Sequence, residues 1–229
     1  KAESQFLLDI LTHDIKGYLH GSRLLLDLDL ETIDKQSLSM IENNLSRINT
    51  LVERVRRYRA LDRFRETVFL PMNLIEVIEK NLKDVSQSFP QNPIDFKINL
   101  DPEVEKFEIL GNEFLNDIFL NIFQNAVKHH RNKPEAYFNI TIKEIEKHWR
   151  ISIEDDGPGI PSDQVNSLFS ISTNEPPTTE KGLGHLIVRK TVAWYGGEVW
   201  AENRMIGDKI EGATIHVTLP MISAKYQKS

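Results

Sequence analysis

The sequence has no cysteine, and this absence removes several classes of function before any motif is considered. Without thiols there is no disulfide framework, no thiolate nucleophile and no cysteine-based zinc site. Long hydrophobic runs are also missing. No apolar stretch approaches the roughly 20 residues that a membrane span needs, and the first residues lack the hydrophobic region of a signal peptide. We therefore expect a cytoplasmic protein that makes no membrane contact through this stretch of sequence.

Positive charge is scarce as well. The 28 Lys and Arg residues are outnumbered by 34 Asp and Glu residues, which leaves a formal net charge of −6. No basic stripe interleaves with aromatic residues, the pattern by which proteins bind a phosphate backbone. The sequence therefore predicts no nucleic-acid partner. Its 40% of hydrophobic residues is an ordinary share, sufficient for one or two packed domains.

Residues 6–64 carry a helical pattern that breaks only between residues 29 and 34. On both predicted helices, apolar residues recur at alternating three- and four-residue steps, which is typical of the seam of a helical bundle. The seam positions are Leu8, Leu11, Ile15, Tyr18, Ser22 and Leu25, then Leu38, Ile41, Leu45, Ile48, Val52 and Val55. A lone hairpin offers each apolar face a single partner, so we expect an antiparallel helical hairpin that forms a four-helix bundle as a homodimer.

After Leu70 and Pro71 the pattern changes to alternating strands and helices. Apolar and polar residues alternate in several short segments, which predicts half-buried strands. The predicted strands lie at residues 94–100, 140–142, 151–153 and 215–219, and the predicted helices at residues 115–129 and 183–194. This order indicates a mixed sheet covered by helices on one face, an α/β sandwich. We expect an α+β protein with a hairpin domain at residues 1–68 and a sandwich domain at residues 69–229.

Two glycine motifs and one polar helix face stand out in the second half. Asp155 follows a predicted strand directly, and the next glycines, Gly157 and Gly159, allow a tight turn that approaches a ligand closely. A carboxylate there can accept a hydrogen bond from an exocyclic amine. Gly182 and Gly184 open a predicted helix, whose free N–H groups can cradle a phosphate. Each motif alone is equally compatible with an ordinary turn or a glycine-rich cap.

The polar helix face consists of Asn121, Asn125 and Lys128, spaced at i, i+4 and i+7. Two amide oxygens and an ammonium group on one face suit a Mg²⁺-phosphate cluster, because Mg²⁺ takes few protein oxygens and lysine supplies a point charge to phosphate. A polar stripe of this kind is also compatible with a solvated helix face.

Together, in this order and spacing, these motifs resemble the Asn-containing, Asp-Gly-x-Gly and Gly-x-Gly boxes of the ATPase superfamily shared by histidine kinases, gyrase, Hsp90 and MutL. The resemblance covers residues 71–220 and implies ATP and Mg²⁺ as cofactors, with ATP held between the Asn-box helix and a lid. It implies that Asn125 is the metal ligand and Asp155 the adenine-reading carboxylate. The other nucleotide contacts that it implies are Asn121, Lys128, Gly157, Gly159, Gly182, Gly184 and Thr214. Histidine kinases usually have Asn where this chain has Asp156.

Near the beginning of the chain, His13 is followed directly by Asp14. With Leu8 and Leu11 in the seam, His13 faces solvent, where an imidazole nitrogen can act as a nucleophile and an adjacent carboxylate can orient the ring or take its proton. A histidine beside an acid is also compatible with an ordinary surface pair. Another candidate acceptor, His20, lies seven residues on, on the same helix face, but lacks a following acid.

The segment from His13 to Leu19 resembles the His-Glu-x-Lys/Arg-Thr/Asn-Pro-Leu box of histidine kinases, with Gly17 and Tyr18 as its larger departures. This resemblance implies that His13 accepts the γ-phosphoryl group of ATP, with Asp14 and Lys16 as further catalytic residues. It also implies a response-regulator receiver domain as a partner and a cytoplasmic core that can belong to a longer, membrane-bound sensor. Two alternatives stay open, an ATP-driven conformational clamp and a degenerate dimeric scaffold.

Overall fold

The computed structural model of the chain describes residues 2–26, 34–102, 104–130, 135–169 and 181–222. Contacts within the chain divide it into a helical unit and an α/β unit. The helical unit runs to Asp62 and also includes residues 181–183, and the α/β unit contains the other described residues from Arg63 on. The two units are described separately below.

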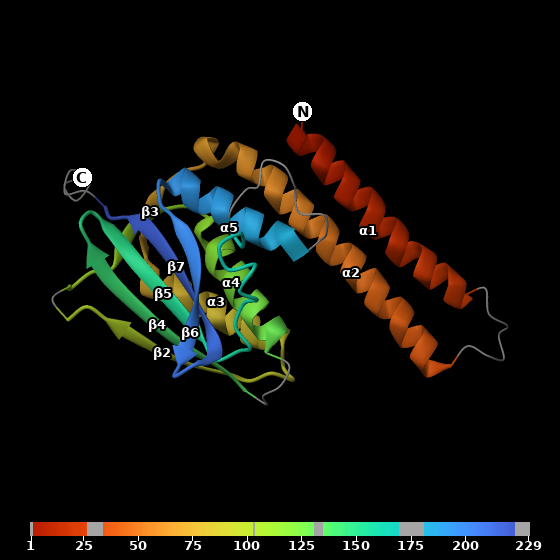
Figure 1. Cartoon of the computed structure of the whole chain (residues 1–229). Helices are drawn as coiled ribbons and strands as arrows, with labels where there is room; N and C mark the ends of the chain where they lie inside the picture. The colour runs from red at the N-terminus through yellow and green to blue at the C-terminus, as the bar shows by residue number, and fades with distance from the viewer. Residues whose placement is uncertain (1, 27–33, 103, 131–134, 170–180, 223–229) are drawn as a thin grey trace. The chain divides into compact units, whose positions relative to one another are not determined.

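The helical unit is an antiparallel pair of helices, α1 (Ala2–Leu26) and α2 (Lys35–Ala60) (Figure 1). Helix α2 begins after Asp34, whose carboxylate accepts a hydrogen bond from the Ser37 N–H and thereby caps the first turn. The two helices are joined by the Asn44 amide, which donates to the Ser22 hydroxyl over 3.2 Å. The predicted helical hairpin is thereby confirmed.

Helix α1 runs without a break through Gly17 and Tyr18, the two departures from the kinase box. The guanidinium of Arg47 on α2 lies over the ring of Tyr18, 5.6 Å from the ring centroid. A side chain added at Gly17 would meet no atom within 4 Å. Neither residue therefore interrupts the helix that carries His13.

The α/β unit contains a five-stranded sheet in the order β2-β4-β5-β7-β6, in which β2 runs parallel to β4 and all other pairs are antiparallel. Three helices cover one face of this sheet, and a separate two-stranded ladder joins β1 to β3 (Figure 1). The strands are β1 (Leu70–Asn73), β2 (Ile94–Leu100), β3 (Glu108–Gly111), β4 (Ala136–Ile145), β5 (His148–Asp155), β6 (Val199–Ile206) and β7 (Lys209–Pro220). The helices are α3 (Leu74–Ser88), α4 (Leu115–His129) and α5 (Lys181–Tyr195), and a 3-10 helix spans Leu61–Glu66.

The core lies between the sheet and its helices. Alternate residues of the central strands, such as Phe138, Ile140 and Ile151, are fully buried, as are Phe119 and Phe123 of α4. The residues between them in β4 and β5 are polar and lie on the opposite face of the sheet, because side chains alternate along a strand. This confirms the predicted α+β fold and its mixed-sheet sandwich.

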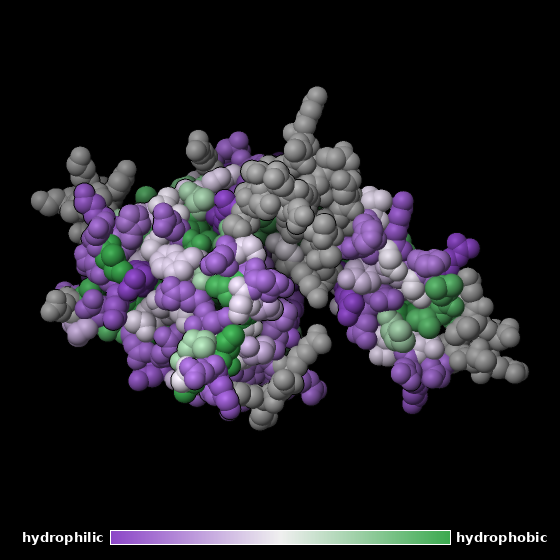
Figure 2. All heavy atoms as spheres, viewed as in Figure 1, coloured by the Kyte–Doolittle hydropathy of each residue, from purple (hydrophilic) through white to green (hydrophobic). Residues whose placement is uncertain are grey.

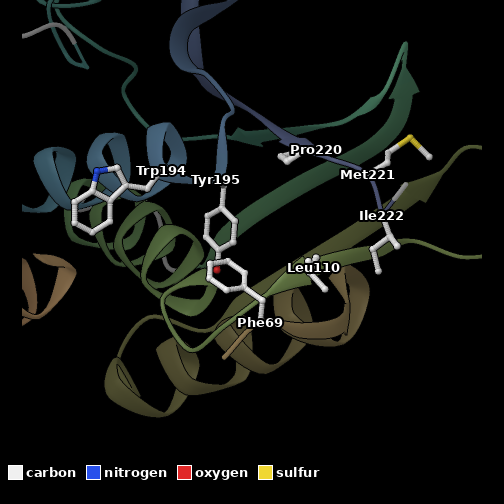
Figure 3. Close-up of a pocket in the computed structure, with 7 residues that line it drawn as sticks. All are labelled: Phe69, Leu110, Trp194, Tyr195, Pro220, Met221 and Ile222. Carbon is white, nitrogen blue, oxygen red and sulfur yellow. The ribbon is translucent and has the colours of Figure 1, made fainter. Parts of the chain in front are cut away.

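An apolar cavity of about 250 Å³ lies at the carboxyl end of α5 (Figure 3). Its lining residues are Phe69, Leu110, Trp194, Tyr195, Pro220, Met221 and Ile222. The hydroxyl of Tyr195 donates to the side chain of Asn112 over 2.6 Å, and burial raises the pKa of this phenol. The cavity is an apolar pocket that is open to the surface, distant along α5 from the helix end that carries Gly184.

Candidate active site

Asp155 is the last residue of β5, and its carboxylate is held by two backbone groups. Its Oδ1 accepts hydrogen bonds from the N–H of Gly157, over 2.8 Å, and from the N–H of Ala213, over 3.3 Å. Burial raises the pKa of this carboxyl, and the two N–H donors lower it to a smaller extent. The carboxylate is therefore fixed in orientation at the strand end, in a poorly hydrated position.

The glycines of the turn are required by its geometry. A side chain at Gly157 would place its Cβ 2.8 Å from the Asp155 Oδ1. Gly159 has a φ of 76°, and an added Cβ there would overlap the side chain of Ile210. A third glycine, Gly212 on β7, has a φ of 134°, and its Cβ would overlap the carbonyl of Asp155. The backbone can follow this path past the carboxylate only because these positions lack side chains.

Asn203 on β6 holds the far end of the same turn. Its amide oxygen accepts from the Ile160 N–H and its amide nitrogen donates to the Ile160 carbonyl, both over 2.7 Å. One side chain thus satisfies both backbone groups of a residue in an irregular segment, which keeps the turn docked on the sheet.

The Asn-box helix and the second glycine motif come together in the structure. A Cβ at Gly184 on α5 would lie 3.0 Å from the Asn121 Oδ1 and 3.5 Å from the Asn125 Nδ2 on α4. The Asn121 amide also donates to the Asp117 carbonyl one turn earlier, over 2.7 Å, which orients its oxygen. Lys128 lies half-buried in the last turn of α4, and Gly182 lies in the first turn of α5.

Thr214 is placed differently from the other predicted contacts. It lies opposite Glu154 on β5 and Glu202 on β6, so its side chain shares the polar face of the sheet with theirs. Its neighbour Ala213 is the residue whose N–H reaches Asp155. The structure therefore does not bring the Thr214 side chain to the carboxylate, and a nucleotide contact by Thr214 stays a prediction.

His13 lies on α1 with 82% of its side chain exposed, while the neighbouring Asp14 side chain is only 11% exposed. The Nδ1 of His13 is 2.9 Å from the Asp14 Oδ1. Because a carboxylate can only accept, this bond places a proton on Nδ1 and leaves the Nε2 lone pair directed away from Asp14. The exposed Nε2 is therefore suited to attack an electrophile. Lys16 and His20 are both exposed on the same helix.

Among the described residues, no group of three or more His, Asp or Glu side chains is placed to hold a metal ion. A Mg²⁺ ion bound here would depend on the amide oxygens of the Asn box and on the phosphates of a nucleotide. That donor set fits Mg²⁺, which keeps several waters and commonly binds through substrate phosphates. The described part of the chain also contains no helix that combines the length and the apolar character of a membrane span.

Residues 111–223 match the family of histidine kinase-, DNA gyrase B-, and HSP90-like ATPases. The chain is 26% identical over 204 residues to the signal transduction histidine-protein kinase/phosphatase MprB of Mycobacterium avium, covering 87% of this chain and 37% of MprB. Among solved structures, the histidine kinase AdeS of Acinetobacter baumannii is 17% identical, with a TM-score of 0.63 over 94% of this chain and 98% of the solved AdeS chain.

A second solved structure is that of the histidine kinase ThkA in complex with the response regulator protein TrrA. It is 24% identical to this chain, with a TM-score of 0.58 over 96% of this chain and 59% of the ThkA chain. The present chain thus spans well under half of the length of MprB, but its hairpin and sandwich are both found in the solved kinase structures. Residues 111–223 thus form an ATPase domain of the histidine kinase-, DNA gyrase B- and HSP90-like type, and the chain as a whole is similar to the corresponding part of sensor histidine kinases.

Proposed function

We propose that the chain transfers the γ-phosphoryl group of ATP to Nε2 of its own His13 and then to an aspartate of a response-regulator receiver domain. In the first step a P–N bond forms at the imidazole, and the bond between the γ-phosphorus and the bridging oxygen of ADP breaks. The observation that carries this proposal is the exposed His13, paired with a largely buried carboxylate, in a chain that also contains the ATPase domain.

The nucleotide would be held at both ends by residues of the α/β unit. The oriented carboxylate of Asp155 accepts a hydrogen bond from the exocyclic amine of adenine, and Gly157 and Gly159 let the backbone approach the base. The Asn121 amide and the Lys128 ammonium bind the phosphates, beside the N–H groups at the amino end of α5, where Gly182 and Gly184 lie.

Mg²⁺, when bound through Asn125, supplies charge neutralisation for the phosphates. The remaining catalytic groups belong to α1. Asp14 holds the His13 ring with its Nδ1 proton and stabilises the imidazolium that forms when Nε2 is phosphorylated. Lys16 lies three residues from His13 on the same helix face, so its ammonium can offset the charge of the incoming phosphoryl group.

Replacing Asn125 by Ala is expected to reduce Mg²⁺-dependent labelling of the protein by about 100-fold, or about 2.7 kcal/mol of transition-state stabilisation, while thermal unfolding stays near that of the native chain. The side chain is half-buried, so its removal leaves little of the core disturbed. The measurement is the initial rate of labelling by γ-labelled ATP across a Mg²⁺ titration. Gln124→Ala, one position earlier on α4, is the matched control. Equal rates for the two variants would contradict the metal-ligand assignment.

The surface of the helical hairpin supports assembly into a homodimer. Several of its apolar side chains are about half exposed, and Figure 2 shows hydrophobic residues, in green, on the hairpin surface. These residues are Leu19, Leu24, Leu26, Leu38, Met40 and Leu45. A second hairpin would bury such a surface and complete a four-helix bundle.

Sedimentation at micromolar concentration is expected to show a dimer for the native chain and a monomer for the double variant Leu38→Glu, Leu45→Glu, because charges cannot be buried unpaired in the bundle. Leu70→Glu in β1 is the control, since that leucine is 60% exposed outside the hairpin. A native monomer, or a dimer that survives both hairpin substitutions, would refute the proposed interface.

The division into a phosphotransfer domain, residues 1–68, and an ATP-binding domain, residues 69–229, is likewise a proposal. The rings of Phe64 and Tyr195 are 4.9 Å apart, and Thr67 accepts a hydrogen bond from Asn112 over 2.6 Å. This packing supports a boundary a few residues earlier, near Arg63.

A further inference from the structure

His130 is a buried polar residue in the ATPase domain that the proposed reaction does not use. It follows α4 directly as the cap residue of the Asn-box helix, and its N–H donates to the Val127 carbonyl over 3.1 Å. Only 2% of its side chain is exposed. The ring Nε2 lies 2.9 Å from the Glu135 carbonyl oxygen, which can only accept, so Nε2 carries a proton.

The same Nε2 lies 3.4 Å from the Oδ1 of Asp156, the second acid of the adenine-reading turn. That oxygen also accepts a hydrogen bond from the N–H of Tyr137 on β4, over 3.0 Å. Asp156 therefore contacts both strand β4, through Tyr137, and the end of helix α4, through His130. These partners are backbone or buried groups, which hold their positions better than exposed side chains do.

The contact between His130 and Asp156 matters because of the neighbours of Asp156 in the chain. It separates Asp155, which reads the base, from Gly157, whose N–H orients the Asp155 carboxylate over 2.8 Å. On the other side of the turn, the His130 Nδ1 would lie 3.5 Å from a Cβ at Gly157, so the imidazole also packs against the turn. A shift of Asp156 would move both the carboxylate and its backbone donor.

We propose that His130 and Asp156 are positioning residues that hold the adenine-reading turn in register with the Asn-box helix and thereby set the selectivity for adenine over guanine nucleotides. The inference rests on the proposed function, in which Asp155 reads the adenine amine. His130 connects the two ends of the site, because α4 carries the phosphate-binding residues and Asp156 fixes the base-reading turn. Guanine presents a carbonyl where adenine presents the amine, so discrimination depends on the exact placement of the Asp155 acceptor.

The test compares binding of ATP and of GTP, by competition with a fluorescent ATP analogue, for the native chain and for His130→Leu, His130→Gln, Asp156→Ala and Asp156→Asn. Leucine fills the buried site but donates no hydrogen bond, whereas the terminal amide of glutamine can replace the Nε2 donor. Asparagine keeps the acceptor for Tyr137 and His130. His148→Leu, at the opposite end of β5, is the control for loss of a histidine from the same domain. Thermal unfolding verifies that each variant is folded.

We expect His130→Leu and Asp156→Ala each to lower the ratio of the GTP to the ATP dissociation constant by about tenfold, the effect of losing one polar contact that anchors the turn. We expect the double variant to lower it no further than either single one. His130→Gln, Asp156→Asn and His148→Leu are expected to keep the native ratio.

A uniform loss of affinity for both nucleotides, with the ratio unchanged, would overturn the inference and leave His130 a purely structural residue. An unchanged ratio in Asp156→Ala would overturn it even if His130→Leu fails to fold. Failure of the native chain to bind ATP at all would overturn the proposed function and the inference together, so the two failures are distinguishable.

Discussion

His13→Gln is expected to abolish the acid-labile, base-stable label that γ-labelled ATP introduces into the native chain, while ATP affinity stays unchanged. The substitution removes the only nucleophilic nitrogen at the position paired with Asp14, but it leaves the α/β unit that binds the nucleotide intact. Glutamine favours a helix and His13 is 82% exposed, so α1 should keep its stability. The measurement is label on the protein after incubation with ATP and Mg²⁺, together with a nucleotide titration of the same preparation.

His20→Gln is the matched control, since His20 is an exposed histidine on the same helix and is expected to be dispensable. Label retained in His13→Gln and lost in His20→Gln would move the phosphoacceptor to His20. Release of free phosphate by the native chain without any protein label would favour a conformational clamp ATPase. The absence of both would favour a dimeric scaffold without kinase activity.

The parts of the fold that could be predicted from the sequence are those set by local periodicity. Alternating apolar residues such as Ile151 and Ile153 mark a strand because only one face of the sheet is covered by helices. The strand signal lies within a few residues. The proximity of Asn121 and Asn125 to Gly184 carried no such local signal, and only the family resemblance implied that these motifs share one site.

The remaining features of the site depend on residues that are distant in sequence. The Asp155 carboxylate is held by the N–H of Ala213, and Ile160 is held by Asn203, 43 residues away in the chain. The Ala213 donor is a backbone N–H, which any residue other than proline supplies, so the sequence gives no sign of it. Asn203 is a single asparagine in a strand and belongs to no recognisable motif. Only the glycine at position 212 offered a signal, as a residue that tolerates its φ of 134°.

The register of β7 decides which face of the sheet Thr214 occupies, because side chains alternate along a strand. The nucleotide contact that the resemblance implied for this threonine stays a prediction. Pairing with Glu154 puts Thr214 on the polar face of the sheet, and Ala213 takes the place beside Asp155. No sequence motif includes His130, and its contact with Asp156 depends on the buried geometry of the turn.

Asp155→Asn is expected to weaken ATP binding by at least about 100-fold, because asparagine presents an amide donor or a weaker acceptor to the adenine amine in a buried position. The loss should be specific: GTP, which has no amine at that position, is expected to lose much less affinity. Nucleotide titration of the native chain and of Asp155→Asn, with both ATP and GTP, measures this difference. Equal losses for the two nucleotides would contradict the assignment of Asp155 as the base-reading acceptor.

The same substitution is expected to stabilise the protein at neutral pH. Burial raises the pKa of Asp155 above its ordinary value of 3.8, so the folded state binds this proton more tightly than the unfolded chain does. The stability of the native chain therefore falls as pH rises from 3.8 through the raised pKa, and above it the cost of the buried charge is complete. Asparagine keeps an oxygen for the Gly157 and Ala213 N–H groups without that charge. Thermal unfolding should show Asp155→Asn above the native chain at pH 7, with the difference narrowing toward pH 4.

Asp34 provides a control of opposite sign, because hydrogen bonds from Ser37 lower the pKa of that carboxyl. A carboxyl with a lowered pKa stabilises the folded state above pH 3.8, and this stabilisation is lost as pH falls through the lowered value. Asp34→Asn is therefore expected to lie at or below the native chain at pH 7. A gain in stability for Asp34→Asn equal to that for Asp155→Asn would show that the effect comes from the reduced net charge of the protein. A gain confined to Asp155→Asn, accompanied by the loss of ATP affinity, would show that the carboxylate is kept at the strand end for nucleotide recognition at the expense of stability.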